Sequence, residues 1–331
     1  MKRVDSLDRL QYDRPLVLAI GTFDGVHRGH RYMLAQAHER ARAHGLAFGV
    51  ITFDPAPALV LRPGLADYQI TGRATKERLL AALEPDFLAV LPFTRAFAAL
   101  TPEEFVDQLE TGLKVAEMWM GDDFRFGHGR EGGIPYLIER GRRSGFDVHV
   151  VARQGVEAGA PGVSSSAVRD AIRAGDMGIV TLLLGRPFEL SGEVVHGQRR
   201  GRTLGYPTAN VAVGREQIVP ASGVYAAVAE LSSGADAPSE RHAAAVSVGT
   251  NPHFNGIETT VEAYLLDFDR DIYGRDLRVS FVERLRAQER YDGLAPLLAQ
   301  MAADVEDTRR IIGPLLSNQP SVVSHQLLAD G

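Results

Sequence analysis

The chain contains no cysteine among its 331 residues. This absence excludes disulfide bonds, thiolate zinc sites and cysteine nucleophiles. No apolar run approaches the roughly 18 residues that would cross a membrane, and the first residues lack the apolar core of a signal peptide. We therefore expect a cytoplasmic protein without a membrane partner.

Positive charge is also scarce, because 36 Lys and Arg stand against 42 Asp and Glu and give a formal net charge of −6. A mildly acidic chain argues against a nucleic-acid partner, but it still allows a local basic pocket for small phosphates. Hydrophobic residues make up 45% of the chain, as in ordinary globular proteins, and 331 residues are enough for two domains. The sequence leaves self-association open.

The most informative stretch is the string Gly-Thr-Phe-Asp-Gly-Val-His-Arg-Gly-His at 21–30. It follows an apolar run at 16–20 that predicts a buried parallel strand, and it precedes a helical pattern at 32–44. Its glycines let the backbone approach a ligand, and the start of the helix offers free N–H groups to a phosphate. Because His27 and His30 are three residues apart, both can donate hydrogen bonds to phosphate oxygens from one side of the first turn.

Strand and helix patterns alternate through the first half of the chain. Strands are expected at 46–53, 87–91, 115–120 and 147–151, and helices at 75–83, 101–112, 134–144 and 177–184. This alternation predicts a doubly wound, Rossmann-like parallel sheet, in which ligands bind beyond the carboxyl ends of the strands.

Two further loops of this half carry polar or aromatic side chains at such ends. One contains Asp123, Phe124 and Phe126, which offer a hydrogen-bond acceptor and flat faces for a ring. The other contains three serines at 164–166 that cap a helix, with Arg169 one turn later. Residue chemistry alone favours a structural interpretation of both: a loop anchored by two aromatic side chains, and an ordinary helix cap followed by a solvated arginine.

The second half of the chain shows a different pattern of apolar segments. Apolar segments at 188–197, 223–231, 242–249, 260–268 and 277–285 predict strands with little helix between them, which indicates an antiparallel barrel. A helical pattern from Leu294 to Ile312 predicts a long amphipathic helix packed on the barrel. We expect domains at 1–185 and 186–316, followed by a flexible tail at 317–331.

A loop rich in glycine and arginine precedes a short strand in this half. Thr208 and Asn210 alternate along that strand, so both side-chain oxygens can point the same way and bind Mg²⁺ together with phosphates. An edge strand after a basic loop explains the same pattern equally well.

These motifs together resemble a known family. His-x-Gly-His at 27–30 resembles the signature of the nucleotidyltransferase superfamily, and the string at 21–27 is similar to the bacterial FAD synthetases. Pro-Thr-Ala-Asn at 207–210 resembles the signature of riboflavin kinases, and Glu262 matches their catalytic glutamate. The resemblance is to the bacterial bifunctional riboflavin kinase/FMN adenylyltransferase family and spans nearly the whole chain.

The resemblance implies that riboflavin is phosphorylated by ATP in the second domain and that the resulting FMN is adenylylated to FAD in the first, with Mg²⁺ as cofactor. The implied catalytic residues are His27, His30, Arg169 and Glu262. The implied ATP site of the first domain comprises Gly21, Thr22, Phe23, Asp24, Gly25, His27, Gly29, His30, Ser164, Ser165, Ser166 and Arg169, and its flavin site Asp123, Phe124 and Phe126. The implied nucleotide site of the kinase comprises Gly197, Arg200, Gly201, Arg202, Gly205, Pro207, Thr208 and Asn210, with Thr208 and Asn210 holding the metal.

Two positions depart from the family pattern. Ala56 stands where the family has a histidine in Glu-Pro-His-Pro, and His253 stands where threonine is usual. These two departures favour one alternative, a flavin-binding regulator without catalysis. A second alternative, independent of them, is an adenylyltransferase for another phosphate ester, such as phosphopantetheine.

Overall fold

The computed structural model describes residues 1–331 except 7–8, 153–161, 198–204, 233–238, 254–255 and 318–331, and for 250–253 and 256–258 it describes the backbone alone. The chain divides into two compact units, which are treated separately below. The first comprises 1–173, 179–186 and 215–218, and the second comprises 174–178, 187–214 and 219–331. The domain boundaries expected from the sequence stay predictions, and all of the expected tail except Ser317 lies outside the described residues. Within the described residues, no helix combines the length and the apolar character that crossing a membrane requires.

The first unit is built on a six-stranded sheet in which every neighbouring pair of strands is parallel, as the sequence predicts. The order across the sheet is β1-β4-β3-β2-β5-β8. The strands are β1 (Lys2–Val4), β2 (Tyr12–Ile20), β3 (Ala47–Asp54), β4 (Phe87–Pro92), β5 (Leu113–Gly121) and β8 (Asp147–Val151), and a separate two-stranded ribbon is formed by β6 (Arg125–Phe126) and β7 (Gly132–Gly133).

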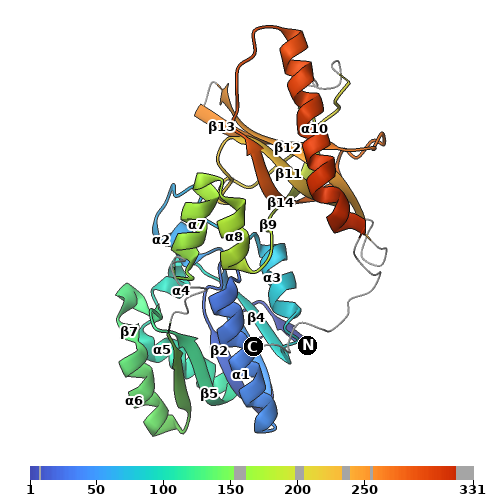
Figure 1. Ribbon diagram of the computed structural model, residues 1–331. Coiled ribbons are helices and arrows are strands. Elements are labelled where there is room, and N and C mark those ends of the chain that lie inside the picture. Colours follow the sequence, from blue (N-terminus) through green and yellow to red (C-terminus); the bar gives the residue numbers. More distant parts are fainter. Residues whose placement is uncertain (7–8, 153–161, 198–204, 233–238, 254–255, 318–331) are drawn as a thin grey trace. The chain divides into compact units, whose positions relative to one another are not determined.

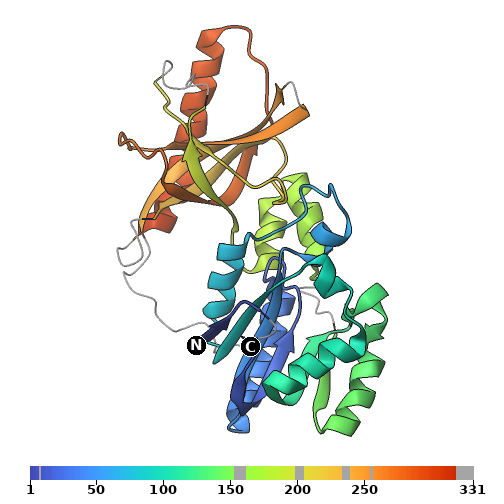
Figure 2. The same cartoon turned by 180° about the vertical axis from the view of Figure 1, so that it is seen from behind.

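Helices cover both faces of this sheet (Figures 1 and 2). One core places Met33 and Leu34 of α1 and Leu80 of α3 against the sheet, and the other places Phe105 of α5 and Leu137 of α6 there. The helices are α1 (Arg28–Ala43), α2 (Pro57–Leu61), α3 (Arg73–Ala81), α4 (Arg95–Ala98), α5 (Pro102–Gly112), the short 3-10 helix η2 (His128–Arg130), α6 (Ile134–Ser144), α7 (Ser165–Ala174) and α8 (Met177–Leu184). Because both faces are covered, β3 is buried along nearly its whole length and β2 is buried from Leu16 to Ile20.

Helix α1 begins at Arg28, four residues before the expected helical pattern. His27 caps it, because the Nδ1 atom of His27 accepts a hydrogen bond from the backbone N–H of His30. His27 is therefore the N-cap and His30 lies in the first turn of the helix, in keeping with the spacing of the two residues.

The second unit is a closed barrel in which every neighbouring pair of strands is antiparallel, again as predicted. The order around the barrel is β10-β13-β12-β11-β14-β9. The strands are β9 (Phe188–Val195), β10 (Ala209–Val211), β11 (Gly223–Leu231), β12 (Glu240–His253), β13 (Gly256–Leu265) and β14 (Asp276–Arg286).

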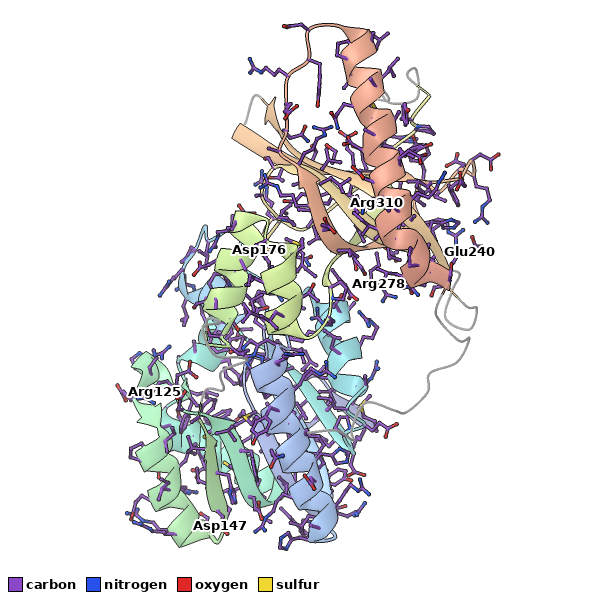
Figure 3. The ribbon with its side chains drawn as sticks, viewed as in Figure 1. Arg125, Asp147, Asp176, Glu240, Arg278 and Arg310 are labelled. Carbon is purple, nitrogen blue, oxygen red and sulfur yellow. The ribbon has the colours of Figure 1, made fainter. Side chains whose placement is uncertain are left out.

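The long helix α10 (Leu294–Ser317) packs on the outside of this barrel (Figure 1). Ile312 of the helix contacts a small core with Ala226 and Val228 of β11, so β11 is buried on both of its faces. Asp304 of α10 accepts two hydrogen bonds, of 2.7 and 2.8 Å, from the guanidinium of Arg286 at the end of β14. Within the barrel wall, Arg278, labelled in Figure 3, pairs with Glu230 on the neighbouring strand.

Candidate active sites

Asp24 organises the turn between β2 and α1. One of its carboxylate oxygens accepts hydrogen bonds from the backbone N–H groups of Ile70, at 2.9 Å, and Thr71, at 3.2 Å. The other oxygen accepts from Nη2 of Arg169 at 2.7 Å. Because Asp24 is buried, its charge is satisfied entirely by these partners, and the turn is fixed to two segments that are distant in sequence.

Arg169 is more constrained than the sequence implies. Its Nε donates to the backbone oxygen of Tyr68 at 2.6 Å, and its guanidinium lies 3.8 Å from the centre of the Tyr68 ring. Together with the ion pair to Asp24, these contacts leave the side chain only 9% exposed. Arg169 thus supports the turn and also lines the cavity described below.

The imidazole rings of His27 and His30 stack with their centres 3.6 Å apart. Since Nδ1 of His27 accepts the hydrogen bond from His30, a neutral His27 carries its hydrogen on Nε2, which makes Nε2 a donor. A Cβ atom at position 29 would lie 3.3 Å from Nδ1 of His27, which is a tight contact. Glycine at this position therefore leaves room for the His27 ring. Phe23 meets the His30 ring edge-on and adopts a positive φ of 47°, a backbone conformation typical of tight functional turns.

Both histidines are neutral at pH 7. Burial is the main reason why the pKa of His27 falls from 6.5 to about 4, and the charge of Arg169 contributes in the same direction. Burial also lowers the pKa of His30 well below its ordinary value, assisted by His27 and Lys76. The stacked pair therefore offers N–H donors to an anion without bringing positive charge of its own.

A cavity of about 760 Å³ opens beside this turn. It brings together nearly all of the residues expected from the sequence to form the first site. Those that line it are Gly21, Thr22, Phe23, Asp24, His27, Gly29, His30, Asp123, Phe124, Phe126, Ser164, Ser165, Ser166 and Arg169. Gly25 does not line the cavity; its N–H donates to Oγ1 of Thr71 at 3.1 Å.

The serines join the two sides of the cavity. Oγ of Ser164 accepts from the backbone N–H of Ala167 and caps α7, as predicted. Oγ of Ser165 donates to the backbone oxygen of Asp24 at 3.0 Å. The N-termini of α1 and α7 are thereby held at one cavity, where both can face an anion.

Four phenylalanines that form an aromatic wall of the cavity were not predicted. Phe53, Phe93, Phe97 and Phe105 line it and contact one another with ring centres 5.3–6.0 Å apart. They come from separate segments, so no local motif marks them. Phe124 stacks on Phe126 with ring centres 5.6 Å apart, and the ring of Phe126 also packs closely against Gly132.

Lys76 is a second residue that sequence reasoning missed. Its side chain is completely buried, and its Nζ donates to the backbone oxygen of Phe53 at 2.5 Å and lies 4.0 Å from the carboxylate of Asp54. It thus holds the end of β3, from which the chain turns to Ala56. Ala56 is 1% exposed and lines the cavity where the family pattern places a histidine.

The second unit brings three predicted residues together on the barrel. Asn210 on β10 lies directly opposite Glu262 on β13, and Oγ1 of Thr208 donates to Oε2 of Glu262 at 3.1 Å. Because the hydroxyl hydrogen of Thr208 points to the carboxylate, its oxygen lone pairs remain for a cation. A side chain at Gly197 would come within 2.3 Å of the Asn210 amide, so only glycine leaves this amide in place.

Gly205, with a φ of +83°, and Pro207 shape the approach to Thr208. Arg200, Gly201 and Arg202, which the sequence assigns to the same nucleotide site, lie outside the described residues, as does the side chain of His253.

Comparison with known proteins agrees with this division. Residues 10–167 match the family model described as FAD synthetase, and 184–312 match the one described as riboflavin kinase. The bifunctional riboflavin kinase/FMN adenylyltransferase of Escherichia coli (strain K12) is 40% identical over 299 residues, covering 90% of this chain and 93% of that protein. The protein of the same name from Pseudomonas fluorescens is 37% identical, covering 95% of this chain and 99% of that protein.

A crystal structure titled macrolide-efflux protein, from Streptococcus pneumoniae, matches with a TM-score of 0.81 and 32% identity, covering 93% of this chain and 98% of that one. Because that name does not mention flavins, this similarity supports the fold alone. The two family models lie along this chain in the order that the sequence predicts. The chain therefore belongs to the bifunctional riboflavin kinase/FMN adenylyltransferase family.

Proposed function

We propose that this enzyme makes FAD from riboflavin in two steps, one in each unit. The barrel unit transfers the γ-phosphoryl group of ATP to riboflavin and forms FMN. The sheet unit joins FMN to the AMP part of a second ATP and releases pyrophosphate. The observation that supports the proposal is that each unit brings together side chains of a kind suited to binding phosphate or its metal: the stacked His27 and His30 in one, and Thr208 hydrogen-bonded to Glu262 in the other.

In the sheet unit, a phosphate oxygen of FMN attacks the α-phosphorus of ATP, and the bond from this phosphorus to the bridging oxygen of the β-phosphate breaks. We propose that Nε2–H of His27 and an N–H of His30 donate to the phosphate oxygens on which charge accumulates. The first N–H groups of α1, at Arg28 and Gly29, precede the first intrahelical hydrogen bond and can add to this. Ser164 and Ser166 offer hydroxyls from the opposite side.

The flavin ring is expected to lie along the aromatic wall. Because Phe126 packs against both Phe124 and Gly132, we propose that Phe126 supports Phe124 and that Phe124 contacts the flavin ring. Asp123, which also lines the cavity, is placed to accept a hydrogen bond from a polar group of the substrate.

In the barrel unit, we propose that the carboxylate of Glu262 takes the proton of the terminal ribityl hydroxyl as its oxygen attacks the γ-phosphorus and ADP leaves. Thr208 and Asn210 supply hard oxygen donors suited to Mg²⁺, and they would hold it together with phosphate oxygens. Bound Mg²⁺ would neutralise phosphate charge as ADP departs.

The decisive experiment incubates the purified enzyme with ATP, Mg²⁺ and either riboflavin or FMN and separates the products by chromatography. We expect FMN followed by FAD in the first case and FAD with pyrophosphate in the second. Phosphopantetheine in place of FMN tests the alternative acceptor, and its exclusive use would overturn the proposed second step. Absence of both products would favour a flavin-binding regulator. ATP as a co-substrate also accords with the cytoplasmic location expected from the sequence.

A further inference from the structure

Glu262 lies in the middle of a polar row on the outer face of the barrel. Along β13, Val261 and Ala263 point into the core and are at most 2% exposed, so Glu262 points outward. In the strand order β10-β13-β12, Asn210 is its cross-strand neighbour on one side and Ser247 on the other. Thr208 and Asn210, the proposed nucleotide side, thus occupy one flank of Glu262, and Ser247 occupies the opposite flank.

Gln288, which follows β14, reaches this opposite flank. Its Nε2 donates to Oγ of Ser247 at 2.8 Å and approaches the backbone oxygen of Val248 at 3.3 Å. Both amide hydrogens are then used, whereas Oε1 of Gln288 has no donor within the described ranges of the chain. Oγ of Ser247 accepts from Gln288 and keeps its own hydrogen to give. At Gly249, two residues along β12, no side chain fills the space between Gln288 and Thr260.

Gln288 and Ser247 therefore present one hydrogen-bond acceptor and one donor near Glu262, the proposed base, and the space at Gly249 beside them is not filled by a side chain. A hydroxyl group both donates and accepts, so a chain of hydroxyls is the chemistry that matches this arrangement. In an in-line transfer the attacking and leaving oxygens lie on opposite sides of the phosphorus. With the nucleotide on the β10 flank, the acceptor substrate must approach Glu262 over the β12 flank.

We propose that Ser247 and Gln288 bind the ribityl hydroxyls next to the one that is phosphorylated and thereby select a polyol side chain. This inference rests on the proposed kinase function and adds to it the part of the site that recognises the acceptor. Neither residue touches the reacting oxygen, so both are specificity-determining residues.

The test measures the kinase step of the full-length enzyme with Ser247→Ala and Gln288→Leu. Loss of a hydrogen bond to a neutral hydroxyl should raise KM for riboflavin about three- to tenfold in each variant. KM for ATP, and the adenylylation of supplied FMN, should stay at wild-type values. Ser247→Thr, which keeps the hydroxyl, should restore most of the affinity. Ser280→Ala, on the outer face of β14 and away from β13, is the matched control and should change nothing.

The possible results distinguish a failure of the proposed kinase function from a failure of the role assigned to Ser247 and Gln288. A wild-type enzyme that makes no FMN would refute the proposed function and this inference with it. Normal kinase activity with an unchanged riboflavin KM in both variants would refute the inference alone. An equal rise in both KM values, not restored by Ser247→Thr, would show a merely structural role and would also overturn it.

Discussion

Asp24→Asn tests whether the turn of the first site depends on a buried ion pair. Asn keeps the shape of the side chain but removes its charge, which leaves the guanidinium of Arg169, only 9% exposed, without a counter-charge. Breaking one side of a buried pair costs about 3–5 kcal/mol. For a unit of this size that corresponds to a fall of about 6–20 °C in the midpoint of thermal unfolding. FAD formation from FMN should fall as well, since the same turn carries His27 and His30.

The chain provides its own probe for this experiment. Trp119 is the only tryptophan, and it lies on β5 of the first unit, where it stacks on His149 at 4.6 Å and donates to Glu117 at 3.1 Å. Its fluorescence therefore follows unfolding of the unit that contains Asp24.

Asp304→Asn is the matched control, because Asp304 forms a similar buried pair with Arg286 in the second unit. It should alter the Trp119 midpoint far less than Asp24→Asn does. If Asp24→Asn melted like the wild type, or if both variants shifted the Trp119 midpoint equally, the turn of the first site would not depend on this ion pair.

Three further predictions follow from single contacts. Gly197→Ala should displace the Asn210 amide, which lies within 2.3 Å of the new methyl position, and should lower FMN formation at least tenfold. Adenylylation of FMN in the same preparation should stay normal. A variant with normal kinase activity would contradict the assigned geometry. Phe124→Leu should raise KM for FMN several-fold without changing KM for ATP in initial-rate assays, and an unchanged KM for FMN would remove Phe124 from the flavin site. Because the pKa of His27 is lowered from 6.5 to about 4, the folded state binds fewer protons than the unfolded state, so stability is complete above pH 6.5 and is lost as the pH falls towards 4. Urea titrations followed by Trp119 should show His27 contributing up to about 3 kcal/mol to this loss, and a His27→Gln variant with the same pH dependence would refute the assignment.

The structure confirms those parts of the fold that are encoded locally. Helix α6 ends where Gly145 adopts a left-handed conformation, and α5 begins at the capping box of Thr101 and Glu104, so both could be placed from a few neighbouring residues. The short helices α2 and α4 were missed, because four or five residues carry too little periodicity to stand out. The order of the strands and the closure of the barrel depend on pairings between distant segments, which no local pattern specifies.

The candidate sites also combine local motifs, which could be predicted from the sequence, with contacts between distant residues, which could not. Motifs such as His27 with His30, and Thr208 with Asn210, keep their reactive groups within a few residues and were visible in the sequence. The tie between Asp24 and Arg169 joins residues 145 positions apart, and Gln288 meets Ser247 across 41 positions. Lys76 reads as an ordinary surface lysine on a helix until the fold buries it under the end of β3. Such contacts become apparent only once the chain is folded.

The central claim is that two separate sites act in succession, and a crossed measurement tests it most directly. Wild-type enzyme, His30→Ala and Glu262→Gln are each given ATP and Mg²⁺ with riboflavin or with FMN, and FMN and FAD are quantified over time. We predict that His30→Ala converts riboflavin to FMN and stops there. Glu262→Gln should form no FMN from riboflavin but should still convert supplied FMN to FAD. If either substitution abolished both steps while the protein remained folded, the two-site account would be contradicted.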